Sequence, residues 1–548
     1  MERQTKIAHL SLLLGVALLT FFSSVLVVTA IFFMIGLQIT SINFFIPLIF
    51  TLLVYYMLLK KYFPDKFNFI FLWSFFGVLS TSILLSFICS FFYDISVDGQ
   101  GYHQEIIIQL AQGWNPIKDK PIETLGAIWI NHYAKGSETI AAVIYYVTGN
   151  IEIGKVTNMF YIISTFLISF SAFMNIFKKQ IVLVILLSLL VAFNPISIYQ
   201  TLSYYIDGQL ASMIMITAML SILLFKDVPK KIVFVAMVAN IIIVTNIKFT
   251  AIVYTVILYS ILFVILLIKK KYVKLKPFVI TCISGFILGI LIVGYNPYVT
   301  NLINQGNPFY PLAGKNAIDI ITEQTPKNLN EKNTVEKFVI SFFVKSENTL
   351  SNQTTNGKWP FMVSNDELKA FSIPDIRMGG FGPLFGGILI LSSIIFIMSL
   401  VLDMKKTLTA SFLIVVLLFI SLINPGSWWA RYVPQIWLIP IIISSLGFIV
   451  SHRRLVTYLC WIVIFCSLVN ISIISGSYIY SQYQTNKVVK NELLLLKEAQ
   501  VVEVDFKHTY SNRIRFQNMG IHYIEVPDPK CSNALYVRNS QTIACMKQ

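Results

Sequence analysis

The sequence predicts a mainly α-helical membrane protein with about thirteen transmembrane helices and a small α/β or β-rich domain at its C-terminal end. Of its 548 residues, 56% are hydrophobic and only 12% are charged. That is too small a charged fraction to cover a soluble core of this size. Apolar runs of about 18–25 residues recur along the chain, and each suffices to cross a bilayer. The net charge of +16 therefore indicates basic loops between spans, and nucleic acid is not an expected partner.

Each predicted span is an apolar run, and the polar breaks between runs set its boundaries. The first run continues to about Phe33, which is longer than the apolar core of a secretory signal, so it is expected to stay as a span. The predicted spans are 8–35, 43–60, 67–93, 156–177, 180–198, 208–225, 230–247, 249–268, 277–296, 381–402, 408–424, 433–450 and 455–478.

Lysine and arginine are distributed between the loops in a way that predicts the topology. With the N-terminus in the cytoplasm, the inside loops read "KKYFPDK", "KDVPKK" and "KKKYVKLK", whereas outside connections such as "GLQITSIN" lack basic residues. Cationic loops resist translocation, so this alternation is the expected one. The segment 94–155, the large loop 297–380 and the C-terminal tail then face outside. We expect a multi-pass protein of the cytoplasmic (inner) membrane whose active site faces the periplasm or cell exterior.

Two domains are expected, a transmembrane domain over 1–480 and an extracytoplasmic domain over 481–548. Within the tail, "VVEVDF" and "HYIEVP" are typical of short strands. Cys531 and Cys545 lie there on the oxidising side of the membrane, so a disulfide between them is expected. The other four cysteines lie in predicted spans, where they serve as small apolar residues.

The stretch "YDISVDGQGYHQE", which follows the third predicted span, concentrates polar groups at the membrane boundary. Asp94 and Asp98 are either solvated loop residues or part of a site, since a carboxylate beside an apolar wall is suited to act as a general base. The glycines around Asp98 let the backbone approach a ligand closely. The segments "QEIIIQLAQGWNP" and "SETIAAVIYYVTGN" then have the apolar period of amphipathic helices lying along the interface.

Further ionisable residues occur at the same predicted face of the membrane. Asp207 begins the sixth predicted span, as a helix cap or as a second acid in a shared cavity. Lys248 lies where the positive-inside rule disfavours lysine, so it either snorkels or offers a cation to phosphate. Arg377 and Arg431 carry planar donor sets that suit phosphate. Trp429 is either part of an interfacial belt or a surface on which a sugar stacks.

Carboxylates and cations gathered at one membrane face suit a lipid substrate that carries a phosphate. A proton-coupled transporter would instead place ionisable groups in mid-span, and the predicted spans are mostly free of them. Two alternatives stay open. A polysaccharide polymerase or O-antigen ligase would use outer-loop arginines, which Arg377 and Arg431 fit. A flippase, transporter or scaffold would be favoured by internal repeats, and the hydropathy shows none.

These motifs, taken together, resemble the GT-C class of integral-membrane glycosyltransferases, which includes protein O-mannosyltransferases and the lipid A aminoarabinose transferase. The Asp-x-x-x-Tyr-His at 98–103 is similar to the acidic motif of their first outer loop. Asp207 is similar to their second acidic position. "KFT" at 248–250, "GNPFYP" at 306–311 and "RYVP" at 431–434 resemble short motifs of bacterial members. The resemblance covers the organisation of nearly the whole chain.

One departure concerns the general base. The mannosyltransferases carry an adjacent Asp-Glu pair in the first loop, whereas here Asp98 is followed by Gly99. Asp94, Asp98 and Glu105 therefore all stay open as the base, with Asp98 preferred.

The resemblance implies an inverting transferase with a sugar donor on polyprenyl phosphate or diphosphate and a lipid, glycan or protein acceptor. Direct displacement needs room for the acceptor, so charges kept apart rather than touching are expected. No cofactor is required, although Asp98 and Asp207 would share a divalent metal if they meet. The assigned roles are Asp98 as base, His103 and Asp207 to orient it or the acceptor, and Lys248, Arg377 and Arg431 to hold phosphate. Residues expected to line the substrate are Asp94, Tyr102, Glu105, Tyr205, Asn307, Tyr310, Trp429 and Tyr432.

Overall fold

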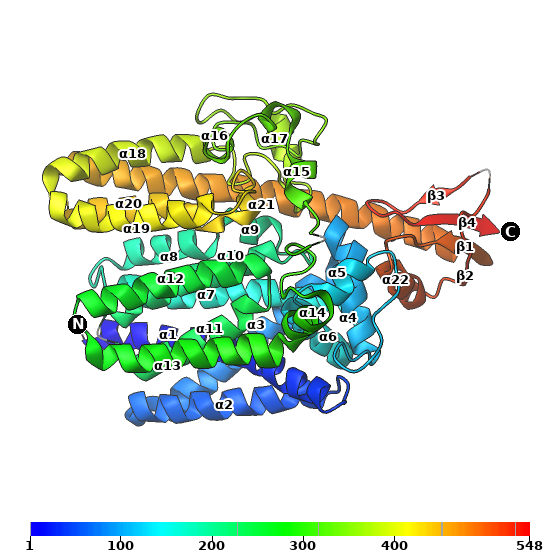
Figure 1. Cartoon of the computed structure of the whole chain (residues 1–548), viewed down its shortest axis with the longest axis horizontal. Coiled ribbons are helices and arrows are strands. Elements are labelled where there is room, and N and C mark those ends of the chain that lie inside the picture. Colours follow the sequence, from blue (N-terminus) through cyan, green and yellow to red (C-terminus); the bar gives the residue numbers. More distant parts are fainter. Residues whose placement is uncertain (1, 227, 316, 451–452, 532, 548) are drawn as a thin grey trace.

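The computed structural model shows long helices that run side by side, with a small sheet beyond one end of them (Figure 1). The N-terminal end of the chain lies at the opposite end of the helices from the sheet that carries the C-terminus (Figure 1). The structure describes residues 2–226, 228–315, 317–450, 453–531 and 533–547.

Ten helical segments of the described chain are long and apolar enough to cross a membrane. The chain is therefore a multi-pass membrane protein, and the predicted fold class is confirmed. The helices of these segments are α1 (Glu2–Met34), α2 (Ile42–Tyr62), α3 (Phe67–Phe91), α7 (Val156–Met174), α10 (Asp207–Leu224), α12 (Phe249–Ile268), α13 (Tyr272–Phe286, continued by a π-helical stretch Ile287–Val293), α18 (Phe385–Leu402), α19 (Met404–Leu422) and α21 (Arg454–Lys497).

The predicted count of thirteen spans is not reached by these ten segments, although every predicted span overlaps a helix. The three remaining ranges contain helices of 12, 16 and 13 residues, which are α8 (Ile181–Ala192), α11 (Lys230–Thr245) and α20 (Leu438–Val450). Prolines shorten two of them. Pro195 follows the end of α8 and opens α9 (Pro195–Tyr199), and Pro434 opens a 3₁₀ turn before α20. Proline offers no backbone N–H to continue a helix from the preceding turn.

Short helices gather at the end of the bundle that also carries the sheet (Figure 1). Helices α4 and α6 correspond to the two predicted amphipathic segments, and they pack against each other with most of their residues buried. Capping boxes at Asn333 and Ser364 fix the starts of α16 and α17. These short helices are α4 (Gln104–Ala111), α5 (Ala127–His132), α6 (Gly136–Thr148), α14 (Thr300–Gln305), α15 (Ile320–Gln324), α16 (Thr334–Ile340), α17 (Asn365–Ala370) and α22 (Ser511–Met519).

Helix α21 has 44 residues and continues past position 480, so its last turns belong to the C-terminal domain. The domain holds four strands in the order β2-β1-β4-β3, and α22 connects the parallel pair β1 and β2. Strand β4 pairs antiparallel with both β1 and β3. A disulfide joins Cys531 to Cys545. The strands are β1 (Val501–Asp505), β2 (Tyr523–Glu525), β3 (Leu535–Tyr536) and β4 (Ile543–Lys547), so both predicted strands are confirmed.

Candidate active site

A cavity of about 820 Å³ lies among the junctions between helices. This volume falls within the range of about 300–1,000 Å³ that is typical of small-molecule sites. Five junctions between helices supply the charged side chains at its centre. They are Asp98 after α3, Asp207 at the start of α10, Lys248 between α11 and α12, Asp375 and Arg377 before α18, and Arg431 between α19 and α20.

Arg431 stands at the centre of this charge cluster. Its Nη1 lies 3.7 Å from Oδ2 of Asp98, 3.6 Å from Oδ2 of Asp207 and 3.4 Å from Oδ1 of Asp375. The guanidinium carbon is 4.1 Å from the ring centre of Trp429, which adds a cation–π contact. Burial alone would lower the pKa of Arg431. Asp375 and the other acidic groups around it outweigh this effect, so that the pKa lies well above its ordinary value. The arginine is therefore a fixed positive charge.

Lys248 and Asp207 form a close ion pair in the cavity. Their Nζ and Oδ1 atoms are 2.6 Å apart, and Nζ lies 4.2 Å from the ring centre of Tyr432. Asp207 is the first residue of α10, where the helix dipole favours a negative charge. A carboxylate held this closely by two cations is suited to placing those cations rather than to accepting a proton.

Asp98 is the most accessible of the three carboxylates that contact Arg431. Its side chain is 33% exposed, against 3% for Asp207 and 19% for Asp375. It directly precedes a π-helical turn, Gly99–His103, which also brings Tyr102 and His103 to the cavity. Of the three acids around Arg431, Asp98 is therefore the one that a molecule entering the cavity can reach most easily.

Asp375 is a site residue that the sequence analysis missed. Its Oδ2 lies 4.0 Å from Nε of Arg377, and its Oδ1 faces Arg431. Burial raises the pKa of Asp375, and Arg431 opposes that effect. A signal existed in "SIPDIRMGGFGP", where an acid precedes the predicted arginine by two residues within a glycine-rich approach to a span.

His103 is oriented by a partner that the sequence analysis also missed. Its Nδ1 contacts Oε1 of Glu138 on α6, and both side chains are buried. A carboxylate on one ring nitrogen fixes the orientation of the imidazole and the protonation of the other nitrogen. Tyr102 packs against the His103 ring with 4.2 Å between the ring centres. Glu138 lies in the predicted segment "SETIAAVIYYVTGN", but nothing in that segment indicates the pairing.

Four predicted site residues do not line the cavity. Asp94 is fully buried, and its two carboxylate oxygens accept hydrogen bonds from the backbone N–H groups of Ser96 and Tyr204. Glu105 is buried and accepts from Nε2 of Gln109. Asn307 accepts from the backbone of its own turn, and the Tyr310 ring packs edge-on against His132. The remaining predicted residues line the cavity: Asp98, Tyr102, His103, Tyr205, Asp207, Lys248, Arg377, Trp429, Arg431 and Tyr432.

The charges of the cavity touch, whereas the sequence predicts that they are kept apart. The reason is burial: an unpaired guanidinium at the bottom of a cavity is costly, and the nearby carboxylates offset that cost. Asp98 and Asp207, which would share a metal if they met, both contact the guanidinium of Arg431. Within the described residues, no group of three or more His, Cys, Asp and Glu side chains is arranged to hold a metal ion.

No protein-family model matches the chain, and no curated protein sequence matches it. Two crystal structures of ArnT from Cupriavidus metallidurans are similar to it. The first, in the apo state, has 9% sequence identity and a TM-score of 0.37, and the match covers 80% of this chain and 83% of that chain. The second, bound to undecaprenyl phosphate, has 9% identity and a TM-score of 0.34, with 82% and 85% covered. Similarity at this level gives no information about the chemistry of this chain.

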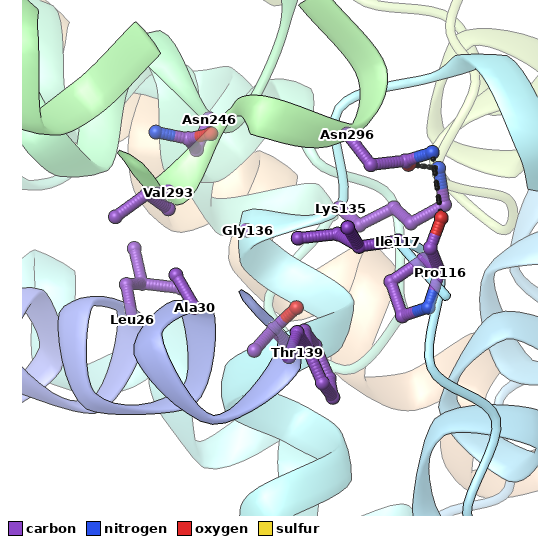
Figure 2. A pocket seen from close by; sticks show the side chains of 11 residues that line it. Leu26, Ala30, Pro116, Ile117, Lys135, Gly136, Thr139, Asn246, Val293 and Asn296 are labelled. Atoms are coloured by element: carbon purple, nitrogen blue, oxygen red, sulfur yellow. Dashed lines mark hydrogen bonds between the residues drawn. The ribbon is translucent and has the colours of Figure 1, made fainter. Parts of the chain in front are cut away.

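A second buried cation, Lys135, supports the wall of the cavity from behind. Its Nζ donates hydrogen bonds to the backbone oxygens of Asn131 and Tyr133 and, at 2.7 Å, to Oδ1 of Asn296. Figure 2 shows Lys135 and Pro116 converging on Asn296 beside a cavity of about 20 Å³. Tyr133 lines the active-site cavity, so Lys135 braces the segment that carries it. Burial lowers the pKa of Lys135 to about 7.

This lowered pKa predicts a pH-dependent stability that Lys135→Met removes. Below pH 7 the folded and unfolded chains both hold the proton. Between pH 7 and the ordinary lysine pKa of about 10.4, the unfolded chain keeps a proton that the folded chain has lost. The wild type therefore gains stability relative to Lys135→Met as pH rises from 7 to 9, by at most about 1.4 kcal/mol per pH unit. Melting temperatures of the two proteins in detergent at several pH values measure this difference.

Lys135→Arg serves as the control, because arginine keeps its proton throughout this range. Its melting temperature should not gain on that of Lys135→Met as pH rises. A constant gap between wild type and Lys135→Met from pH 6 to 9 would show that Lys135 does not titrate there.

Proposed function

We propose that this protein is a membrane glycosyltransferase that moves a sugar from a polyprenyl-phosphate-type lipid to a lipid, glycan or protein acceptor. The transfer takes place at the outer face of the cytoplasmic membrane. One observation carries the proposal: three carboxylates and three cations from five distant junctions meet in a single cavity walled by aromatic rings. Cations suit a phosphate, aromatic faces suit a sugar, and a carboxylate suits an acceptor hydroxyl.

The edge of the cavity is suited to a prenyl chain. Val253 on α12 and Ile423 at the end of α19 both line the cavity, and they are 42% and 46% exposed on the surface of the bundle. The lining thus continues onto the surface that faces lipid between two candidate membrane spans. A prenyl chain lying in the bilayer would pass this edge with its phosphate directed toward the cations inside.

The three cations differ in how firmly carboxylates already hold them. Lys248 is held at 2.6 Å and Arg431 at 3.4–3.7 Å, whereas Nε of Arg377 lies 4.0 Å from the nearest oxygen of Asp375. Arg377 is therefore the cation that pairs with an incoming phosphate at the lowest cost. Arg431 and Lys248 supply the fixed field that stabilises charge on the leaving phosphate.

The reaction that fits this arrangement is a direct, inverting displacement. The acceptor oxygen attacks the anomeric carbon, and Asp98 takes the proton of the acceptor hydroxyl. The bond between the anomeric carbon and the lipid phosphate oxygen breaks, and its electron pair leaves with the phosphate toward Arg377 and Arg431. His103, held by Glu138, orients the acceptor, and Asp207 positions Lys248 and Arg431.

Mass spectrometry of envelope lipids and glycans from cells with and without this protein tests the proposal. We expect cells without it to lose one sugar from an envelope lipid, glycan or protein and to accumulate the sugar-loaded polyprenyl phosphate. Unchanged glycans together with unchanged lipid-linked sugars would refute a transferase. A flippase would instead move the loaded lipid across proteoliposome membranes without releasing free polyprenyl phosphate.

A further inference from the structure

The loop that carries Asp98 is inserted into the core of the C-terminal domain. Ile95, three residues before Asp98, is 5% exposed and belongs to the apolar core that the domain builds from the end of α21 and the strands. Its partners in that core include Val489, Leu493 and Val502, and Tyr93 packs against the same cluster. A segment more than 380 residues away in the sequence thus completes the hydrophobic core of this domain.

Arg515 on α22 holds the same loop by hydrogen bonds. Its Nη2 donates to the backbone oxygen of Asp94 at 2.6 Å, and its Nη1 donates to Oε1 of Gln100 at 3.2 Å. The remaining contacts are with Oε1 of Glu152 at 3.2 Å and Oδ1 of Asn512 at 2.9 Å. The side chain is buried, and its guanidinium lies 4.9 Å from the ring centre of Tyr93.

Gln100 makes a second hydrogen bond with the C-terminal domain. Its Nε2 donates to the backbone oxygen of Asn539 at 2.7 Å and to the backbone oxygen of Ser96. Asp94 and Gln100 bracket Asp98 on either side, so the domain holds both ends of the loop that presents it. The loop is tight: a Cβ on Gly99 would lie 2.0 Å from Oδ2 of Asp94, which only glycine avoids.

The inner side of the loop is fixed to the rest of the cavity wall. Oδ2 of Asp94 accepts from the backbone N–H of Tyr204, whose neighbour Tyr205 lines the cavity. Glu152 accepts from the backbone N–H of Asp94 and pairs with Lys155 at 2.7 Å. Asp94, Glu152, Lys155 and Arg515 thus form a buried network of two acidic and two basic side chains between the transmembrane and C-terminal domains.

A buried network of this kind adds little net stability, because desolvation of the ions offsets most of their attraction. Its effect is geometric, since the hydrogen bonds between buried groups fix where each group lies. Arg513 shows the contrast. It lies two residues earlier on the same helix, is partly exposed, and pairs with Glu525 inside the domain. Only Arg515 contacts the Asp98 loop among the arginines described in α22.

We propose that the C-terminal domain sets the position of Asp98, with Arg515 as the positioning residue that acts through Asp94 and Gln100. The catalytic consequence rests on the proposed function, whereas the hold on the loop does not. The C-terminal domain then contributes to catalysis by positioning an active-site residue. Displacement of a reacting group by about 1 Å can cost about a hundredfold in rate.

Two variants test this in the full-length protein. Arg515→Lys keeps the charge but loses the planar fork that spans Asp94 and Gln100. Gln100→Met keeps the side-chain length and leaves no charge unpaired, so it should fold even if Arg515→Lys does not. For both, we expect faster hydrogen–deuterium exchange in peptides covering 93–103 and a kcat for sugar transfer that falls about tenfold to a hundredfold. The KM for the lipid donor should stay near that of the wild type, because the phosphate-binding cations are untouched.

Arg513→Gln is the matched control, since it breaks an ion pair on the same helix without touching the Asp98 loop. Its exchange in 93–103 and its kcat should equal those of the wild type. Unchanged exchange in Gln100→Met would overturn the hold on the loop. Faster exchange with unchanged kcat would overturn its role in positioning Asp98. If the wild type itself transfers no sugar, the transferase proposal fails, and the exchange data alone decide the structural half.

Discussion

Asp98→Asn is expected to lower kcat for sugar transfer by about 10²–10⁴-fold, the range typical of losing a general base. Asparagine keeps the size of the side chain and its place after α3 but has no carboxylate to take the acceptor proton. The KM for the lipid donor should change little, because Lys248, Arg377 and Arg431 remain. Transfer is measured in proteoliposomes that contain the loaded polyprenyl phosphate extracted from cells lacking the protein.

Glu105→Gln is a sharp control for this experiment, because the sequence alone leaves Glu105 open as the base. In the structure Glu105 is buried away from the cavity and holds Gln109, a contact that glutamine can replace. Its variant should therefore transfer sugar at nearly the wild-type rate. If Glu105→Gln loses activity and Asp98→Asn keeps it, the base has been assigned to the wrong residue.

The architecture of the site could be foreseen because a membrane reduces the possibilities to two faces. Basic loops predict which connections share a face, so Asp98, Asp207, Lys248 and Arg431 are all expected at one end of the bundle. The structure brings these four side chains into one cavity. Topology explains that these side chains share one end of the bundle, but it does not specify which of them touch.

The sequence could not show that Asp98 lines the cavity whereas Asp94 is a buried structural residue. Both lie in one glycine-rich loop, four residues apart, with similar neighbours. The two residues differ in their tertiary surroundings. Asp94 is surrounded by the backbone N–H of Tyr204 and by the buried side chains of Glu152, Lys155 and Arg515. Burial raises the pKa of Asp94 and Lys155 opposes this effect, so its environment is that of a structural group.

Asp375 and Glu138 were missed for a related reason. Each gains its role from a partner supplied by a distant segment, Arg431 for Asp375 and His103 for Glu138, even though Asp375 stands two residues before the predicted Arg377. Sequence patterns reveal which residues share a membrane face, but the pairing of charges on that face depends on side-chain packing.

Removal of the central cation, by Arg431→Met, is expected to have the other large effect. It leaves Asp98, Asp207 and Asp375 facing one another without the charge that all three contact. Loss of one preorganised cation at a developing anion costs about 10²–10³ in kcat. Like charges brought together favour protonation, so the carboxylates of the cavity should bind protons at higher pH than in the wild type. The acidic limb of the pH–rate profile should therefore move to higher pH.

Arg377→Met separates this field effect from phosphate binding. Arg377 lies 4.0 Å from Asp375, the longest ion-pair distance among the cations of the cavity, and its guanidinium is 5.5 Å from the ring centre of Trp429. Its loss should raise the KM for the lipid donor and leave the acidic limb nearly in place. Profiles of kcat and kcat/KM from pH 5 to 9 distinguish the two variants. Equal shifts of the acidic limb in both variants would mean that Arg431 affects the protonation of the cavity carboxylates no more than Arg377 does. Only the total charge of the cluster would then matter.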